Sequence, residues 1–274
     1  MVSDSEKIRR ILVAIDASTQ SLAALEIAAQ LAADLGAELA GLYVEDINLI
    51  RLAALPAVLE IGGASARSRR LDEHRMSRQL RSQAARAAQA MAEVAGRSKV
   101  RWSFTVARGS IETELLQAAT ETDLLILGRA GWSGKRKLGS TARKLIAAGP
   151  KRTLVIERGE WRFPTLMTVY DGSDLSQRAL DTAIDIGGYL AIGIVADDEE
   201  HAKKLQREVA AKLKLMGLEA RYRWLVRANT RELADMLHTQ DKCILILPAG
   251  SPLLEGKSLP EALEQLKCPV LLIQ

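Results

Sequence analysis

The sequence predicts an α/β protein that contains two repeated domains, each built on a mostly parallel sheet. Short apolar runs alternate with helical patterns along the chain, and the same series starts again at residue 166. Continuous apolar runs of this length are typical of strands that a parallel sheet buries on both faces. The 274 residues suit two compact domains, which we place at residues 1–158 and 163–274.

Local patterns predict the elements of the first domain. The apolar run at residues 11–15 ends in Asp16, and the helical pattern from about residue 21 stops at Gly36. A glycine at this point is a common helix C-terminus. Further strands are expected at residues 39–44, 100–106, 124–127 and 153–156, with a helix at residues 111–119.

The strongest candidate site is the loop GRAGWSGKRKLGST, residues 128–141, which precedes a helical stretch at 142–148. Glycines let the backbone approach an anion, and a helix N-terminus favours negative charge. Ser140 and Thr141 can supply an N-cap and hydroxyl donors. The loop also contains the cations Lys135, Arg136 and Lys137. The alternative is a basic surface connection with no ligand.

The position of this loop favours a ligand site. In open parallel sheets, ligands bind outside the carboxyl ends of the strands, at the switch point between the halves. Asp16 follows the first strand and Gly128 follows a later one. Both are therefore expected to face one crevice.

The second domain repeats the pattern but lacks the loop. Its first strand, residues 166–170, leads into Asp171, and later strands are expected at 244–247 and 269–273. After the first of these, Pro248 and Pro252 remove N–H donors, and Glu255 would repel a phosphate. We interpret Asp171 as a helix cap and the second domain as a degenerate copy.

These features together resemble the universal stress protein family in its tandem form, over nearly the whole chain. Nucleotide-binding members of that family carry an aspartate after the first strand and the motif Gly-x2-Gly-x9-Gly-Ser/Thr. Asp16 matches the aspartate, Gly128 and Gly131 match the first pair of glycines, and Gly139 and Ser140 match the last pair. Seven residues, rather than nine, separate Gly131 from Gly139.

The resemblance implies an adenine nucleotide alpha hydrolase-like, Rossmann-like domain whose last strands pair antiparallel, here as an internal pseudo-dimer. It also implies a cytoplasmic stress-response protein whose first domain binds ATP or a related adenine nucleotide, accompanied by Mg, as a regulatory ligand. No general base is evident, so an enzyme is not expected, although weak ATP hydrolysis stays open. The residues implied for the adenosine end are Asp16 and Val44, and those for the phosphates are Gly128, Arg129, Gly131, Gly139, Ser140 and Thr141.

The segment at residues 45–98, which has no evident counterpart in the second domain, ends in a basic helix. Nine arginines and one lysine oppose three acidic residues between Arg67 and Arg101, a local charge of +7 in a chain of net charge +4. One interpretation is a packed helix with a solvated face; the other is a docking surface for an acidic protein partner, an anionic lipid or a nucleic acid. Aromatics are only 4% of the chain and do not interleave with these arginines, which argues against stacking on single strands. No specific nucleic-acid partner is expected. A homodimer stays open.

Other chemistries find little support. His74, His201 and His238 lie apart without metal-ligand spacing, so no metal site is predicted. Cys243 and Cys268 are interpreted as reduced core residues, not a disulfide or a metal site. No apolar stretch approaches the roughly 20 residues that cross a bilayer, and the charged N-terminus does not predict export.

Overall fold

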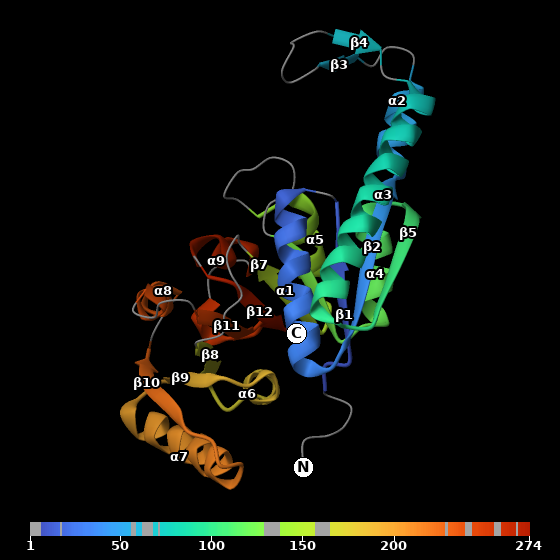
Figure 1. Cartoon of the computed structure of the whole chain (residues 1–274). Coiled ribbons are helices and arrows are strands. Elements are labelled where there is room, and N and C mark those ends of the chain that lie inside the picture. Colours follow the sequence, from blue (N-terminus) through green and yellow to red (C-terminus); the bar gives the residue numbers. More distant parts are fainter. Residues whose placement is uncertain are drawn as a thin grey trace.

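The computed structural model describes residues 7–16, 18–55, 59–61, 68–70, 72–128, 138–156, 165–227, 230–238, 243–254, 259–266 and 268–274. Within these residues, ten strands form one sheet and two short strands form a separate hairpin (Figure 1). The strands of the sheet are β1 (Arg10–Ala14), β2 (Glu38–Asp46), β5 (Trp102–Gly109), β6 (Leu124–Gly128), β7 (Arg152–Ile156), β8 (Thr165–Tyr170), β9 (Tyr189–Ala196), β10 (Ala220–Val226), β11 (Cys243–Pro248) and β12 (Val270–Ile273).

The strand order is β10-β9-β8-β11-β12-β7-β6-β1-β2-β5. We call β1 to β7 the first half and β8 to β12 the second half. The two halves have the same order, because the first sheet strand of each lies between its second and fourth. All neighbours are parallel except β12 and β7, which pair antiparallel with Val270 opposite Val155.

This topology confirms the predicted fold class, and it confirms the antiparallel pairing of the two last strands. The domain limits stay a prediction, because the join near residues 158–163 lies outside the described residues.

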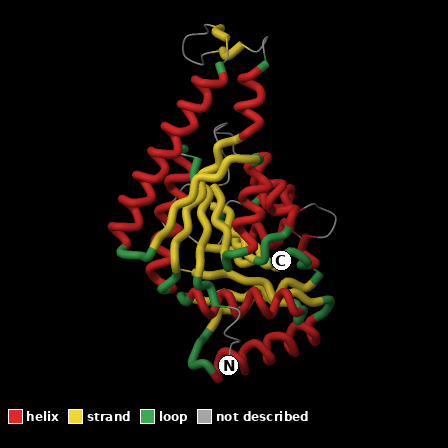
Figure 2. The backbone as a smooth tube through the Cα atoms, turned by 90° about the vertical axis from the view of Figure 1, so that its right-hand side faces the viewer, coloured by secondary structure: helices red, strands yellow, loops and turns green. Residues whose placement is uncertain are grey.

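Helices cover both faces of the sheet, as Figure 2 shows. On one face, α1, α3, α6 and α7 pack against a core that runs through both halves, and α4, α5, α8 and α9 build a second core on the other face. The helices are α1 (Thr19–Leu35), α2 (Ile47–Ala54), α3 (Glu73–Ser98), α4 (Ile111–Thr120), α5 (Ser140–Ala148), α6 (Asp174–Ile186), α7 (Glu199–Leu215), α8 (Thr230–His238) and α9 (Leu259–Gln265), with the short 3₁₀ helix η1 (Pro252–Leu254). None of the helices described is both long and apolar enough to span a membrane.

The two cores explain the apolar runs of the sequence. Ile11 and Val13 of β1 enter one core, whereas Leu12 between them enters the other. A strand covered on both faces needs apolar side chains at every position. Helix α1 ends as expected at Gly36, whose φ of 64° is left-handed.

The longest addition to the repeated topology is an arm formed by α2, the β3 (Leu59–Ile61)–β4 (Ser68–Arg70) hairpin and α3, which extends beyond the sheet (Figure 1). The prediction that the whole segment 45–98 lacks a counterpart is wrong for α3. Helix α7 occupies the same place between the second and third sheet strands of its half and packs on the same face. Among the elements that the structure describes in this segment, α2 and the hairpin are additional. The equivalence of α3 and α7 was missed because the two helices have unlike charge patterns.

Several contacts join the halves beside the β7–β12 pair. Arg143 of α5 forms an ion pair with Glu264 of α9. The Gln274 side-chain amide donates to the Ile146 carbonyl at 2.9 Å. Arg152 Nε donates to Thr182 Oγ1 at 3.3 Å, so β7 also contacts α6. The seam is therefore both a continuous sheet and a packed helix contact.

Candidate functional site

A cavity of about 450 Å³ opens at the carboxyl ends of β1, β2 and β6. This is the switch point of the strand order, since β1 lies between β2 and β6. The chain after β2 leads to α3 on one face of the sheet, and the chain after β6 leads to α5 on the other. The cavity size lies within the range of small-molecule sites. Its place is the one where parallel sheets bind ligands.

The structure brings six of the eight predicted site residues to this cavity. Asp16, Val44, Gly128, Gly139, Ser140 and Thr141 all line it. Arg129 and Gly131 lie outside the described residues, as do Lys135, Arg136 and Lys137. The nucleotide roles of all eight stay predictions, but six positions from four parts of the chain share one crevice.

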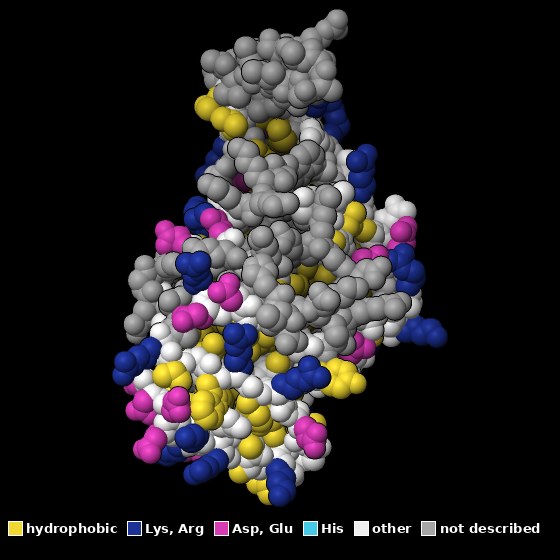
Figure 3. All heavy atoms as spheres, turned by 90° about the vertical axis from the view of Figure 1, so that its left-hand side faces the viewer, with side chains coloured by type: hydrophobic (Ala, Val, Ile, Leu, Met, Phe, Trp, Pro, Cys, Tyr) yellow, Lys and Arg dark blue, Asp and Glu magenta, His cyan; other side chains and the backbone are white. Residues whose placement is uncertain are grey.

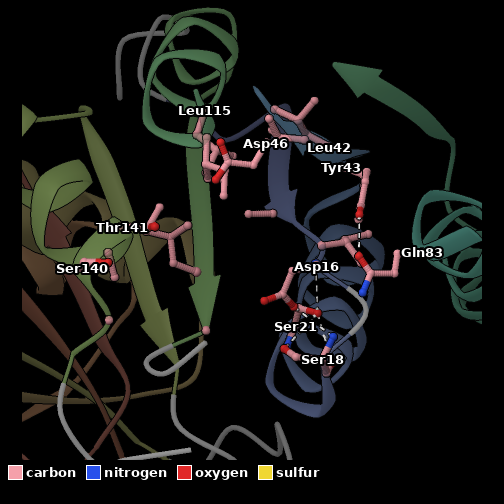
Figure 4. Close-up of a pocket in the computed structure, with 18 of the residues that line it drawn as sticks. Asp16, Ser18, Ser21, Leu42, Tyr43, Asp46, Gln83, Leu115, Ser140 and Thr141 are labelled. Atoms are coloured by element: carbon pink, nitrogen blue, oxygen red, sulfur yellow. Dashed lines mark hydrogen bonds between the residues drawn. The ribbon is translucent and has the colours of Figure 1, made fainter. Parts of the chain in front are cut away.

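The Asp16 carboxylate is held in a tight turn before α1 (Figure 4). Its Oδ1 accepts from the Ser18 backbone N–H at 2.9 Å, and its own backbone N–H donates to Ser21 Oγ at 3.2 Å. Ser18 is the N-cap, because its hydroxyl oxygen accepts from the Ser21 N–H at 3.2 Å. The positive end of α1 is thus already satisfied by side chains, while Asp16 faces the cavity.

Helix α5 begins differently, on the opposite side of the cavity. Its N-cap is Gly139, with extended dihedrals of −61° and 154°, and within the described residues no side chain caps the helix. The expectation that Ser140 and Thr141 supply the cap is wrong, because both already lie inside the helix. No acidic residue stands in the first turn either. The N–H groups and the helix dipole therefore leave an anion-binding end beside the cavity.

Tyr43 forms the wall opposite α5 (Figure 4). Its side chain is only 3% exposed, and its hydroxyl donates to Gln83 Oε1 of α3 at 3.0 Å. Burial, followed by the charges of Glu45 and Asp16, raises the pKa of Tyr43 to about 12. At neutral pH this residue is therefore an uncharged hydrogen-bonding group.

Asp46 supplies a second carboxylate to the cavity, and it also caps α2 by accepting from the Asn48 N–H at 2.9 Å. The neighbouring Glu45 is not available to a ligand in the same way. Its buried carboxylate is paired with Arg108, whose Nη2 lies 2.6 Å from Oε2. The acidic surface of the cavity thus comes from Asp16 and Asp46.

The cavity also contains residues that were not predicted from the sequence, namely Tyr43, Asp46 and Gln83, together with Leu49 and Leu80. All five lie at the end of β2 or in the arm, which the sequence presented as an insertion. One signal was available, because Asp46 stands between a strand and a helix in the same way as Asp16. No local pattern shows that Gln83, forty residues from Tyr43, reaches its hydroxyl.

The second half has the same turn but a different loop. Asp171 Oδ1 accepts from the Ser173 N–H at 2.9 Å, and Ser173 caps α6 by accepting from the Ser176 N–H at 3.2 Å. The N-cap of α6 is therefore Ser173, two residues after Asp171, and the interpretation of Asp171 as the cap is wrong. After β11 the chain forms η1, in which Leu253 and Leu254 are buried. Apolar side chains enter the core at this point of the second half.

The sequence profile described as the Universal stress protein family matches residues 7–157, more than half of the chain. The chain belongs to this family. A comparison with curated protein sequences finds no match. The matched segment contains the cavity and the loop, so the family assignment rests on the half in which the site residues lie.

Solved structures extend the likeness over both halves. A universal stress protein from Archaeoglobus fulgidus DSM 4304 has a TM-score of 0.73 at 16% identity, covering 97% of this chain and 96% of that chain. A putative universal stress protein from Pseudomonas aeruginosa UCBPP-PA14 has a TM-score of 0.65 at 16% identity, with 98% and 94% covered. At these identities the likeness shows the fold alone.

Proposed function

We propose that the first half of this universal stress protein binds ATP or a related adenine nucleotide as a regulatory ligand. The observation that carries the proposal is the uncapped N-terminus of α5 beside a 450 Å³ cavity. A phosphate group would accept hydrogen bonds from the backbone N–H groups at the start of α5, from which no side chain in the described residues accepts. Gly139, Ser140 and Thr141 would contact it, and the predicted residues Gly128, Arg129 and Gly131 would also hold the phosphates.

The adenosine would occupy the other end of the cavity. The carboxylate of Asp16 has one oxygen in the turn and offers the other to a ribose hydroxyl or a base amino group. Val44, Leu49 and Leu80 give this end an apolar lining, which suits the faces of a base. A carboxylate at the adenosine end and a helix N-terminus at the phosphate end match the polarity of a nucleotide.

The nucleotide would bring its own magnesium ion. No group of three or more metal-ligating side chains occurs in the part of the chain that the structure describes. Mg²⁺ commonly binds through phosphate oxygens, waters and one or two carboxylates. Asp16 and Asp46 are the carboxylates available. We propose a regulatory role in a cytoplasmic stress response rather than catalysis.

Isothermal titration of the purified chain with ATP and Mg²⁺ tests this proposal. We expect one site per chain, with inorganic phosphate release no faster than in buffer over the same period. Absence of binding would refute the proposal, and two equivalent sites would refute its restriction to the first half. If one site per chain were found together with sustained release of inorganic phosphate, the protein would be an ATP hydrolase and not a regulatory binding protein.

A second candidate function is protein docking through the arm. Arg75, Arg78 and Arg81 are exposed on α3. In Figure 3, Lys and Arg side chains flank the arm, whereas the lower part of that face carries both basic and acidic side chains. Exposed apolar side chains lie in the same arm; they are Leu49 and Leu52 of α2 and its C-cap residue Leu55. A basic and apolar surface suits an acidic protein partner or a second copy of the chain that presents acidic residues.

Binding to polyglutamate at low and physiological salt tests this candidate. A variant with Arg75, Arg78 and Arg81 changed to Gln should lose most of the salt-dependent binding. The matched control changes three exposed cations of the equivalent helix α7, Lys204, Arg207 and Lys214, to Gln. Equal losses in both variants would show that net charge alone, and not the arm, attracts the probe.

A further inference from the structure

The only two cysteines of the chain meet across neighbouring strands. Cys243 is the first residue of β11, and Cys268 precedes β12 by two residues. In the parallel β11–β12 pair, Leu245 lies opposite Val270. The same register carried back by two residues sets Cys243 opposite Cys268. The strands are still bonded just above this level, because the Leu245 N–H donates to the Pro269 carbonyl at 3.0 Å.

Both thiols lie on the same face of the sheet. Cys243 belongs to the core that also contains Leu245 and Val270, and Cys268 packs against that core. Neighbouring strands are about 4.8 Å apart, and disulfides join residues whose Cα atoms are roughly 4.4–6.8 Å apart. The backbone therefore already has the spacing that a disulfide requires.

The surroundings of the pair favour oxidation. A hydrogen bond from the Cys268 thiol lowers the pKa of Cys243 below that of an ordinary cysteine, against the opposing effect of burial. Cys243 is 5% exposed, whereas Cys268 is partly open to solvent. Cys268 is therefore the more accessible of the two residues to a small oxidant, while Cys243 is buried beside it as the second nucleophile.

We propose that Cys243 and Cys268 form a redox-modification site that closes to an intramolecular disulfide when the protein meets a hydroperoxide. When the proton of the Cys268 thiol passes to the Cys243 sulfur that it bonds, the Cys268 thiolate attacks the peroxide oxygen, the O–O bond breaks, and a sulfenic acid forms with release of water or an alcohol. Cys243 sulfur then attacks the Cys268 sulfur, the S–S bond forms, and the sulfenic oxygen leaves as water. Two thiols lose two electrons and two protons, which the peroxide takes up.

The disulfide would enclose the segment between β11 and β12, which contains η1 and α9. Glu264 of α9 pairs with Arg143 of α5, the helix that begins at the cavity of the first half. Closing a loop of this length restricts the unfolded chain. The oxidised protein should therefore melt at a higher temperature, by roughly 5–10 °C for a chain of this size.

Titration of the native protein with hydrogen peroxide tests the site. We expect both thiols to disappear together, the intact mass to fall by two hydrogen atoms, the protein to stay a single chain, and dithiothreitol to reverse each change together with the rise in Tm. Both thiols surviving, oxygen added to Cys268 while Cys243 stays reduced, or disulfide-linked dimers would each overturn the proposal.

Two comparisons locate the effect. The Cys243→Ser variant should carry sulfenic or sulfinic acid at Cys268 at the peroxide dose that closes the wild-type disulfide, because the second sulfur is missing. The same titration in denaturant should give the intramolecular disulfide at least tenfold more slowly, since the strands no longer hold the sulfurs together. Equal rates in native and unfolded protein would show that the β11–β12 register contributes nothing.

Discussion

The two halves of this chain share a strand order and a first turn, yet they differ at one loop. Asp16, Ser18 and Ser21 share two hydrogen bonds with Asp171, Ser173 and Ser176, one from the N–H two residues after the aspartate and one that caps the helix. After the fourth strand, no side chain within the described residues caps α5 beside the cavity, whereas the second half buries Leu253 and Leu254. The aspartate turn therefore belongs to the fold, and we expect ligand binding to depend on the loop after the fourth strand.

The largest effect should come from breaking the seam that makes the halves one sheet. Val155→Pro removes an N–H from β7, between β6 and β12, and should lower the free energy of unfolding by about 3 kcal/mol or more. Denaturant unfolding should then show two transitions, one for each half. Val155→Ala retains the N–H and should keep a single transition. Unchanged stability and one transition in the proline variant would contradict the coupling of the halves through this pair.

A smaller effect should distinguish the two loops. A Gly139→Val side chain at the start of α5 would obstruct close approach of a phosphate and should weaken ATP binding by about 1–3 kcal/mol, the value of hydrogen bonds to charged groups. Gly250→Val, after the equivalent strand of the second half, is the matched control and should leave the affinity unchanged. Titration calorimetry measures both, and equal affinities for the two variants would remove the phosphate end of the site.

The smallest effect concerns the wall of the cavity. The pKa of Tyr43 is raised to about 12, so the unfolded chain, with a tyrosine pKa of about 10, loses this proton first as pH rises. The contribution of Tyr43 to the free energy of unfolding is fully present below about pH 10. It falls between about pH 10 and 12, by about 1 kcal/mol at pH 11. Tyr43→Phe should lose this share of the pH dependence. Tyr189→Phe, at a position that is 79% exposed, should keep the pH dependence of the wild type. If the free energy of unfolding depended on pH in the same way in both variants, the buried state of Tyr43 would be contradicted.

The sequence predicted most of the fold because two cores demand apolar residues at every strand position. Runs such as residues 11–15 identify buried strands by themselves, and glycines such as Gly36 mark helix ends. The apolar last strands of the two halves favoured pairing at their edges, and the antiparallel direction of the β7–β12 pair came from the family resemblance. The equivalence of α3 and α7 was missed, since helices at the same place share packing but not surface charge.

Most of the site was predicted where a residue directly follows a strand. Asp16 and Gly128 stand at such places, so their position in the crevice follows from the sheet, whereas Val44 came from the family resemblance. Tyr43 and Gln83 meet only because α3 folds back over β2, and Cys243 meets Cys268 only through the register of two strands. Contacts of this kind depend on tertiary packing, which no local pattern encodes.

The most direct test of a nucleotide site in the first half compares two aspartates with the same local structure. Asp16→Ala and Asp171→Ala each remove a carboxylate that accepts from the N–H two residues later, and Asp171 also accepts from the Ser173 hydroxyl at 2.6 Å. Asp16→Ala should therefore lose about 1 kcal/mol of stability and Asp171→Ala at least as much. Only Asp16→Ala should weaken ATP binding in calorimetric titration, by about tenfold or more. Loss of affinity in Asp16→Ala alone would support a ligand role for the first half. Unchanged affinity in Asp16→Ala, or an equal loss in Asp171→Ala, would contradict it.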